Sequence, residues 1–461
     1  MVASRAPAVS VVIPTYNWSA ALRCALRSVL LQTMQDFEIL VVGDGCTDDS
    51  EAVVAEFNDP RIRWHNLERN YGSQWVANNY ANEHAAGDWI AYLGHDDIWF
   101  PTHLSAILQA ARRESAEIVT STMILYWPEG TGGRGIAGIF PSGAYGPEDF
   151  VPPSAFAHAR ALYGDVVRWR DPDSVALPMD AAFLSEMAVA GRKFAATGEL
   201  TCFKFNAAWR RDAYRVKAVT EQQRMLDRIE SGVDFRQTEL LDVLQAVVAS
   251  RFVAAGVPPT AGVEKGSLVR RNRRYKGLDS RFDAGTLRRI DRPTRFDVSQ
   301  QSMPFEWQDA EVDPTHGAFR WTGPSPRATI DLPVIFDRDL AIRIQVIKTM
   351  RPDLADSIKL SVHEHQLAVQ VRRAGSTFLL EAKVTRAGVE STDRDFGVTI
   401  DAGAVARPCD VGRGPDRRWL GLAVNWIELR PADWQPTATY QSPYQPLISV
   451  RDWLWQKLGK S

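Results

Sequence analysis

The first 130 residues alternate between short, continuous apolar runs and longer stretches in which apolar side chains recur every three or four positions. The short runs predict buried strands, and the longer stretches predict amphipathic helices. The predicted strands cover residues 9–13, 37–42, 61–65 and 88–93, and the predicted helices cover residues 19–33, 47–57, 74–86 and 102–113. This alternation predicts an α/β, Rossmann-like domain, with a mostly parallel sheet, flanking helices and right-handed crossovers.

Three of the predicted strands end in polar residues. Thr15 to Asn17 follow the first strand, Asp44 follows the second, and Asp96 and Asp97 follow the fourth. Ligands of open parallel sheets bind beyond the carboxyl ends of the strands, so we expect the three segments to line one crevice. Each segment alone is also typical of a surface turn.

The pattern between residues 117 and 300 is less regular. It predicts a strand at 117–126, a long Gly- and Pro-rich loop at 127–153, and helices at 155–163, 181–190 and 219–256, with a break at Gly232. A loop of that length is typical of an active-site lid, here for an acceptor. The basic stretch at 265–295 is typical of a solvated linker; the alternative is contact with an anionic acceptor or a membrane surface.

Beyond residue 300 the apolar positions alternate with period two. Short runs of this kind, separated by turn residues, predict an antiparallel β-sandwich of seven or eight strands. Trp307, Trp321 and Trp426 could form a platform for a sugar, although aromatic residues more often pack in a core. The expected organisation is an N-terminal domain at 1–215, a helical and basic linker at 216–300, a β-sandwich at 301–435 and an amphipathic tail at 436–461. Such a tail could dock on the sandwich, on a partner or on a membrane interface.

Composition narrows the class of protein. The chain has 461 residues, of which 45% are hydrophobic and 24% are charged, as in ordinary soluble proteins. A net charge of -2 argues against a general nucleic-acid binder. The four cysteines show no paired spacing, so neither a disulfide framework nor a zinc site is expected. Without a signal peptide or an apolar span, we expect a cytoplasmic protein, with peripheral contact at the inner face of the membrane.

Three motifs carry a resemblance to a known family. They are Val-Val-Ile-Pro-Thr-Tyr-Asn at 11–17, Val-Val-Gly-Asp-Gly-Cys-Thr-Asp at 41–48 and Tyr-Leu-Gly-His-Asp-Asp-Ile-Trp-Phe-Pro at 92–101. In this order and spacing, residues 8–215 resemble the family 2 glycosyltransferases, which are inverting enzymes with the GT-A fold. The resemblance implies hexosyl transfer from a nucleotide-sugar donor of the UDP, GDP or dTDP type to a glycan or lipid-linked acceptor. It also implies Mg²⁺ or Mn²⁺ as cofactor and a place in bacterial surface polysaccharide biosynthesis.

The resemblance also implies which residues bind the donor. The implied donor-binding set is Pro14, Thr15, Tyr16, Asn17, Asp44, Asn79, His95, Asp96 and Asp97, with Asp96 and Asp97 at the metal. Read physically, the Thr15 hydroxyl can meet a base or ribose, and Asp44 can accept a hydrogen bond from a ring nitrogen of uracil or guanine. An Asx turn before Gly45 is the alternative for Asp44.

The sequence departs from the family at four positions. Gly43, Gly94 and Met179 stand where the family usually has an acid, and Asn78 stands where it often has an arginine. Asp97 is therefore expected to replace the acid lost at Gly94. We expect His95 to lie beside the metal site or in solvent, because histidine is not a preferred ligand of Mg²⁺.

Asp180 is the expected catalytic base. It stands at the start of a predicted helix, where the family has its base, and an inverting transfer needs one carboxylate to deprotonate the acceptor hydroxyl. The helix N-terminus should keep it ionised. A helix-start acid without catalytic role is the alternative. Ser154, Lys204 and Trp209 are weaker candidates for contacts with donor or acceptor.

Two other functions compete with a glycosyltransferase. The replaced acids are typical of a catalytically weakened carbohydrate- or nucleotide-binding scaffold protein. A nucleotidyltransferase has a similar sheet, but it would show a Gly-rich loop with Arg and Lys after the first strand, and residues 14–21 contain none.

Overall fold

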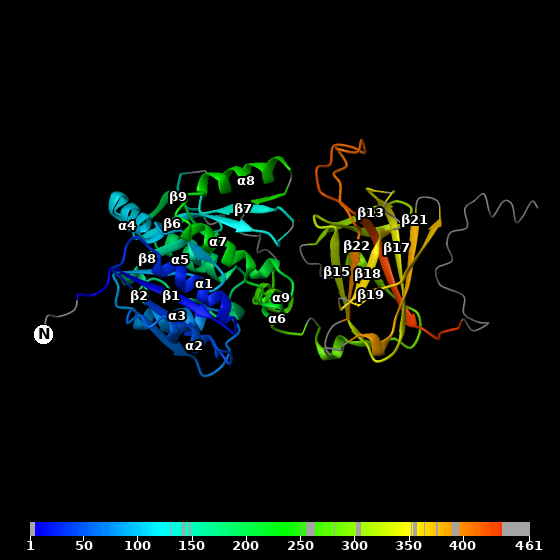
Figure 1. Cartoon of the computed structure of the whole chain (residues 1–461), viewed down its shortest axis with the longest axis horizontal. Helices are drawn as coiled ribbons and strands as arrows, with labels where there is room; N and C mark the ends of the chain where they lie inside the picture. Colours follow the sequence, from blue (N-terminus) through cyan, green and yellow to red (C-terminus); the bar gives the residue numbers. More distant parts are fainter. Residues whose placement is uncertain are drawn as a thin grey trace, which may run out of the picture.

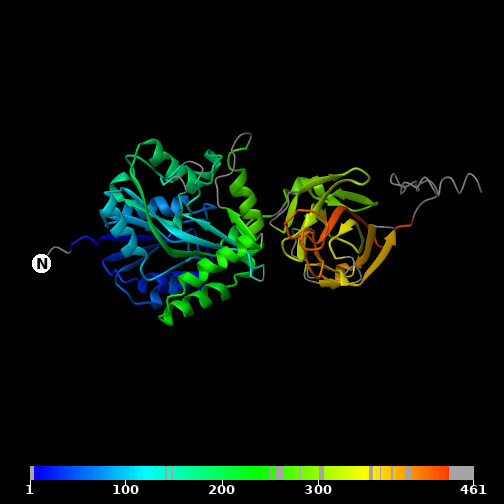
Figure 2. The same cartoon turned by 90° about the horizontal axis from the view of Figure 1, so that it is seen from above.

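The computed structural model describes residues 5–435, apart from positions 130, 141–142, 147–148, 250, 255–262, 281, 301–305, 352, 354–356, 364, 375–376 and 390–395. The predicted amphipathic tail at 436–461 lies outside the described residues. The N-terminal α/β part and the C-terminal β part lie side by side along the long axis of the molecule (Figures 1 and 2). No helix in the described part is both long and apolar enough to cross a membrane.

A ten-stranded sheet forms the centre of the N-terminal part. Its strands are β1 (Val9–Thr15), β2 (Phe37–Gly43), β3 (Ile62–Asn66), β4 (Trp89–Tyr92), β5 (Ile98–Trp99), β6 (Ile118–Tyr126), β7 (Arg134–Ala137), β8 (Phe156–Ala159), β9 (Phe194–Lys204) and β10 (Phe252–Ala254). The order is β10-β7-β6-β8-β4-β1-β2-β3, and β9 pairs with both β5 and β6. The β3-β2-β1-β4 half is entirely parallel, so the carboxyl ends of these strands meet at one edge. The predicted GT-A-like architecture is confirmed.

Helices cover the sheet and extend the domain. They are α1 (Ser19–Leu30), α2 (Ser50–Glu56), α3 (Trp75–His84), α4 (His103–Glu114), α5 (Met179–Val189), α6 (Ala213–Val216), α7 (Thr220–Glu230), α8 (Arg236–Val248) and α9 (Ser267–Lys276). The amphipathic spacing read from the sequence explains α1 and α4, whose apolar faces are buried. Gly232 has φ 74° and separates α7 from α8, as predicted.

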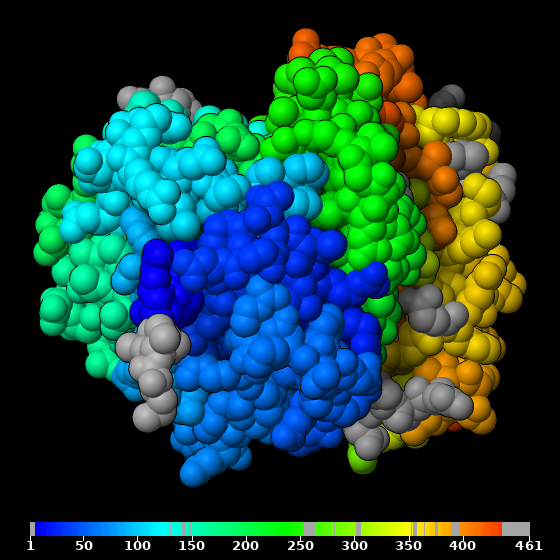
Figure 3. All heavy atoms as spheres, turned by 60° about the vertical axis from the view of Figure 1, so that its left-hand side comes forward, coloured from blue at the N-terminus to red at the C-terminus, as the bar shows by residue number. Residues whose placement is uncertain are grey.

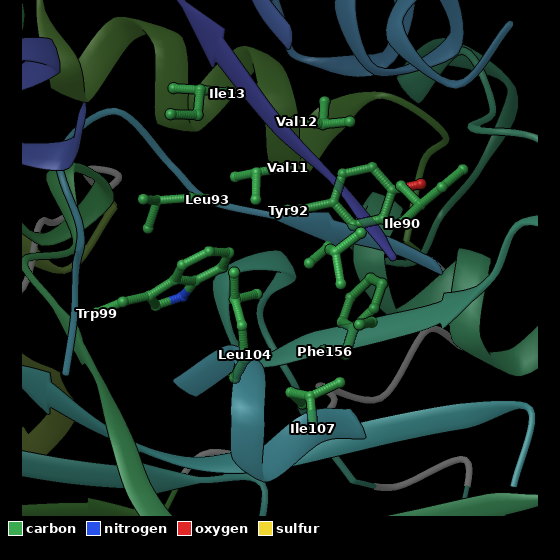
Figure 4. Packing of buried hydrophobic residues seen from close by; sticks show 14 of the residues in the cluster. Val11, Val12, Ile13, Ile90, Tyr92, Leu93, Trp99, Leu104, Ile107 and Phe156 are labelled. Atoms are coloured by element: carbon green, nitrogen blue, oxygen red, sulfur yellow. The ribbon is translucent and has the colours of Figure 1, made fainter. Parts of the chain in front are cut away.

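The main core lies where β1 and β4 meet α4 and β8. Figure 4 shows Val11, Tyr92, Leu104 and Phe156 from these four elements around one apolar volume. Burying one large apolar side chain of this kind stabilises the fold by about 1.5–3 kcal/mol. The core therefore fixes the ends of β1 and β4, which carry the polar residues, relative to one another.

One predicted helix is wrong. Residues 155–163 form strand β8 between two short 3-10 turns, η1 (Pro153–Ala155) and η2 (Arg160–Leu162). The strand pairs antiparallel with β4 on one side and with β6 on the other. This pairing satisfies the backbone of a buried segment, and it outweighs the helix preference of the alanines in it.

Four elements within the expected linker at 216–300 belong to the N-terminal part, namely α7, α8, α9 and β10. Strand β10 joins the large sheet beside β7. The side-chain amide of Gln222 in α7 donates to the main-chain oxygen of Asp96, at 3.1 Å. The Tyr126 hydroxyl in β6 donates to the buried carboxylate of Glu239 in α8, at 2.6 Å. In Figure 3 the green segment, which contains α7, α8 and α9, lies between the blue N-terminal segment and the yellow and orange C-terminal segment.

The C-terminal part is the predicted antiparallel β-sandwich. Its strands are β11 (Arg288–Arg289), β12 (Thr294–Asp297), β13 (Trp307–Asp313), β14 (Gly317–Thr322), β15 (Arg327–Leu332), β16 (Val334–Ile335), β17 (Leu340–Thr349), β18 (Lys359–Val362), β19 (His365–Leu367), β20 (Val369–Ala374), β21 (Thr377–Val384), β22 (Phe396–Asp401) and β23 (Leu422–Pro431). Seven strands form one sheet and four form the other, and their apolar faces share one core. The predicted strand number of seven or eight was too low.

The three tryptophans proposed as a sugar platform do not form one. Trp307 and Trp321 are buried, with 7% and 5% of their surface exposed. Trp426 is covered by the guanidinium of Arg295, 3.8 Å from its ring centroid. Core packing, the alternative, describes the first two correctly.

Specific polar contacts join the two parts. Arg211 makes a two-pronged ion pair with Asp331 of β15, with one N–O distance of 2.6 Å. At the end of α8, the indole of Trp419 donates to the main-chain oxygen of Ala249, at 2.5 Å. The β-sandwich thus has a defined position beside the sheet edge.

We expect Tyr126→Phe to lower the free energy of unfolding of the N-terminal part by about 1.5–3 kcal/mol, because a hydrogen bond to a buried charge is lost while the ring stays packed. Calorimetric unfolding of the full chain measures this. Tyr80→Phe is the matched control, since the Tyr80 ring stacks between His65 and His84 and its substitution keeps those contacts. Equal losses in the two variants would contradict an anchoring role for α8.

Candidate active site

The polar strand ends line one cavity, as predicted. It has a volume of about 1030 Å³ and lies beyond the carboxyl ends of β1, β2 and β4. Of the expected residues, Pro14, Thr15, Tyr16, Asp44, His95, Asp96 and Asp180 line it, together with the weaker candidates Ser154, Lys204 and Trp209. Asn17, Asn79 and Asp97 lie outside its lining. Phe150 and Pro153 bring the end of the predicted lid loop to the cavity wall.

Asp96 presents its carboxylate to the cavity. Only 9% of the residue is exposed, and its carboxylate accepts no hydrogen bond from another of the described residues. Burial alone would raise the pKa of Asp96, but the positive charge of nearby groups, Lys204 foremost, outweighs it and holds the pKa below its usual value. The result is an ionised carboxylate with free ligand capacity.

Asp97 points into the protein. It is fully buried, and its carboxylate accepts hydrogen bonds from the Ser154 hydroxyl at 2.5 Å, the Lys204 ammonium at 2.9 Å and the Phe205 amide at 3.2 Å. Burial raises the pKa of Asp97 to about 6. All of these contacts use the oxygens that a metal ion would need, so Asp97 anchors Lys204 and Ser154 in this structure instead of replacing the acid missing at Gly94.

His95 is part of the packed cavity wall. Its Nδ1 lies 2.9 Å from the Thr15 hydroxyl and accepts from the Tyr16 amide at 3.3 Å, while Nε2 lies 3.2 Å from the Tyr214 hydroxyl. Burial lowers the pKa of His95, which favours the neutral ring. The imidazole thus couples the end of β1 to α6. Of the two positions expected for His95, the one in solvent is wrong, and the one beside the metal site stays a prediction.

Asp44 and Asn17 hold loops around the cavity. The Asp44 carboxylate accepts from the amides of Tyr71 at 2.9 Å and Gly72 at 3.2 Å, which fixes the loop after β3. Asn17 has φ 45°, and its side-chain oxygen accepts from the amides of Thr47 at 2.7 Å and Asp48 at 3.2 Å. Asn17 therefore joins the loop after β1 to the loop after β2.

Asn79 has a structural position in α3. Its amide nitrogen donates to the Trp169 carbonyl at 2.9 Å, and its oxygen accepts from the Trp169 amide at 3.0 Å and from the Tyr163 hydroxyl at 3.1 Å. These contacts use the oxygen and one of the two N–H groups of the side chain to hold the segment before α5. Asn79 lies outside the cavity lining, and the donor contact expected of it stays a prediction.

Asp180 lies in the first turn of α5, facing the cavity. Its carboxylate accepts from the Ala181 amide at 3.0 Å. Burial raises the pKa of Asp180 to about 6, against the opposing effects of that amide and of Lys204. We expected the helix N-terminus to dominate the pKa of Asp180, but the loss of hydration in the cavity has the larger effect. A pKa near 6 suits a group that must accept a proton near neutral pH.

Helix α9 also lies at the site, although its sequence chiefly predicted a linker. Arg273 and Lys276 of this helix line the cavity opposite the strand ends, and Tyr214 lies beside them. Trp307 and Asp331 bring the β-sandwich to the same wall. The signal was present as the basic stretch at 265–295, which we interpreted chiefly as a linker.

The side chains of the cavity offer few ligands for Mg²⁺ or Mn²⁺. Among the described residues, no group of three or more His, Cys, Asp or Glu side chains is arranged to hold a metal ion. Asp96 offers one free carboxylate, while His95 and Asp97 are engaged elsewhere. Mg²⁺ is often held by one or two carboxylates together with substrate phosphates and water. The residues fit a metal ion that Asp96 holds jointly with a phosphate-bearing ligand.

Comparison with known proteins agrees with this geometry. Residues 10–135 match the model of the family described as "Glycosyl transferase family 2". Residues 10–135 are therefore similar to a family 2 glycosyltransferase domain. The matched segment contains all three strand ends that line the cavity, and it ends before Asp180, Lys204 and α9.

Individual relatives match this same domain over part of their length. A β-1,3-glucosyltransferase of Escherichia coli, WfgD, named for UDP-Glc and a diphosphoundecaprenol-linked GlcNAc, is 38% identical over 96 residues, which are 21% of this chain and 38% of the relative. A Campylobacter jejuni β-1,3-glucosyltransferase, named for an undecaprenol-linked glycan, is 32% identical over 122 residues, 26% of this chain and 39% of the relative. An uncharacterised glycosyltransferase of Rickettsia typhi is 34% identical over 98 residues, 21% of this chain and 30% of the relative. The match thus spans well under half of each relative.

Solved structures show a more distant likeness. Residues 1–349 of Staphylococcus aureus TarS, in complex with UDP-GlcNAc, align with a TM-score of 0.38 and 17% identity over 50% of this chain and 68% of that one. A Pyrobaculum calidifontis mannosyltransferase, in complex with GDP-Man and Mn²⁺, aligns with a TM-score of 0.35 and 16% identity over 60% of this chain and 84% of that one.

The two neighbouring acids should respond differently to substitution. We expect Asp97→Asn to lower the free energy of unfolding by about 3–5 kcal/mol, because it leaves the Lys204 ammonium buried without its counter-charge. Asp96→Asn should cost less, since its carboxylate accepts no hydrogen bond from another described residue. Chemical denaturation of the full chain measures both.

The double variant Asp97→Asn with Lys204→Met should recover part of the loss, because no unpaired charge remains. A loss in Asp96→Asn as large as that in Asp97→Asn would contradict the structural role assigned to Asp97.

Proposed function

We propose that this protein transfers a hexose from a nucleotide-sugar donor to an acceptor hydroxyl with inversion at the anomeric carbon. The observation that carries the proposal is the placement of two carboxylates on one cavity of a family 2 domain. Asp96 at the end of β4 is ionised and free, and Asp180 at the start of α5 has a pKa suited to a base. A metal ion that holds a donor phosphate needs an ionised carboxylate, and an acceptor hydroxyl needs a group that takes its proton.

In the proposed reaction, Asp180 accepts the proton of the acceptor hydroxyl as its oxygen attacks the anomeric carbon. The new C–O bond forms on the face opposite the diphosphate, and the old C–O bond breaks with its electron pair left on the diphosphate. A divalent metal ion, when bound, would neutralise charge on that leaving group. Asp96 would hold this ion. No second carboxylate at the described strand ends is available to it.

The donor and acceptor classes follow from the family and its relatives. We propose a UDP, GDP or dTDP sugar for the end of the cavity formed by Thr15, Tyr16 and the Asp44 loop. Two relatives are named for undecaprenol-linked acceptors, so we propose a lipid-linked glycan, elongated at the cytoplasmic face of a membrane in surface polysaccharide synthesis.

Asp180→Asn should reduce the transfer rate by about 10²–10⁴-fold, because it removes a general base while leaving the donor site intact. Transfer by purified protein with Mn²⁺, measured as nucleotide diphosphate released in the presence of acceptor, is the test. Glu186→Gln is the matched control, since Glu186 is on the same helix but pairs with Arg170. A rate unchanged in Asp180→Asn would remove Asp180 from the mechanism.

The rate should also depend on pH in a defined direction. A base with a pKa of about 6 is protonated and inactive below that pH, so kcat/KM should rise through pH 6 and level off above it. Asp97 titrates in the same range, so the profile must be compared between wild type and Asp180→Asn. If the rise of kcat/KM with pH is lost in Asp180→Asn, the titrating group is Asp180. If the rise is unchanged in that variant, another group titrates.

A nucleotide-binding scaffold without transfer is the second candidate. It is favoured by the glycines and the methionine at positions 43, 94 and 179, and by the engagement of Asp97 within the protein. Calorimetry with UDP, GDP and dTDP sugars separates the two candidates. Binding of a nucleotide sugar without turnover in the presence of a broad acceptor panel would support the scaffold.

A further inference from the structure

Helix α9 brings basic side chains to the cavity from outside the segment that matches the family. Most cations of this region have a carboxylate partner. Arg273 pairs with Asp279 at 2.7 Å, Arg270 with Asp173 at 2.9 Å, and Lys204 with Asp97 at 2.9 Å. These pairs explain why so basic a segment can pack against the domain instead of extending into solvent.

Lys276 is different. Among the residues that the structure describes, no carboxylate forms an ion pair with it. Its ammonium lies 5.8 Å from the ring centroid of Tyr214, whose hydroxyl reaches His95, the neighbour of Asp96. Burial lowers the pKa of Lys276. Asp96 and Asp97 attract this ammonium, but burial outweighs their effect on its pKa. Holding a cation in such a place costs free energy, which an anionic ligand in the cavity would offset.

Arg273 has an unsatisfied donor beside the same cavity. Its Nη1 is buried and has no hydrogen-bond partner among the described residues. The guanidinium lies against Gly72, where an added Cβ would come within 2.7 Å of Nη1. The amide of Gly72 donates to Asp44, so Arg273 stands over the loop that surrounds the donor end of the cavity.

The acidic side of the cavity has few free carboxylates to bind a metal ion, whereas the basic side has several cations. Asp96 is the free carboxylate at the end of β4, because Asp97 is occupied by Lys204 and position 94 is a glycine. A leaving diphosphate must have its developing charge neutralised, and fixed cations in a cavity do this as oriented groups that need no reorganisation.

We propose that Lys276 and Arg273 of α9, together with Lys204 of β9, form a cationic cradle that binds the diphosphate of the donor. This inference rests on the proposed function and deepens it. As the bond between the anomeric carbon and the diphosphate breaks, the electron pair remains on the diphosphate oxygen. Lys276 and Arg273 donate hydrogen bonds to that anion, and the acceptor proton goes to Asp180. No other reactant is needed.

Isothermal calorimetry tests the cradle without turnover. The probes are UDP, GDP and dTDP, each compared with its own nucleoside, for the full-length protein with and without EDTA. We expect at least one of the three diphosphates to bind in the presence of EDTA. Lys276→Gln should weaken that binding on the order of 10- to 100-fold, while the affinity for the corresponding nucleoside stays unchanged. Arg273→Gln should act in the same direction, and Lys276→Arg should restore most of the affinity.

Lys265→Gln is the matched control, because Lys265 is an exposed cation just before α9 and outside the cavity lining. It should leave all affinities unchanged. Lys276→Gln should also melt no lower than wild type, because it removes a charge that has no ion-pair partner among the described residues.

Three results would overturn the cradle. They are equal diphosphate affinity in wild type and Lys276→Gln, loss of all diphosphate binding in EDTA, or an equal loss in Lys265→Gln. If wild type binds none of the three diphosphates with or without Mn²⁺, the proposed function fails as well, and this result is distinct from the other three.

Discussion

The buried ion pair between Asp97 and Lys204 is the contact on which the site depends. It joins the turn after β4 to the end of β9, and Ser154 adds η1 to the same carboxylate. The three segments come from distant parts of the chain, and the pair brings them together below the cavity. Since Asp97 is held inward, its neighbour Asp96 is left facing the cavity. A buried pair of this kind is costly to break, so it keeps the orientation of both acids fixed.

The charge balance of the cavity follows from that arrangement. One carboxylate, Asp96, is ionised because cations surround it, while Asp180 is kept closer to neutral by burial. Two acids in one cavity thus have different protonation behaviour, as a ligand for a metal cation and a proton acceptor require. The cations that produce the difference come from β9 and α9, both of which lie beyond the segment shared with the family.

Sequence patterns predicted the parallel half of the sheet, the position of its polar strand ends and the helix that carries Asp180. These features depend on local periodicity and on the rule that strand ends of a parallel sheet meet at one edge. The roles within the motifs were harder to predict. Asp96 and Asp97 are adjacent, and only the turn geometry and the partners at Ser154 and Lys204 decide which of them faces the cavity. The contacts of Asn79 could not be predicted for the same reason, since its partner Trp169 is 90 residues away.

Helix α9 shows why a basic stretch is difficult to interpret from sequence. Glu264, Asp279 and Asp283 lie within nine residues of the α9 arginines they pair with, whereas Asp173, another partner of Arg270, is 97 residues away. The contact with Asp173, which local spacing does not predict, joins the helix to the domain. The β-sandwich matters for the same helix, because Arg211 pairs with Asp331 and both domains then contribute to the wall around α9. Residues 10–135, which match the family, supply the strand ends of the cavity, and later elements supply Asp180, Lys204 and the basic residues of α9. The carboxylates and the cations therefore meet in one cavity only when the segments on either side of residue 135 are folded together.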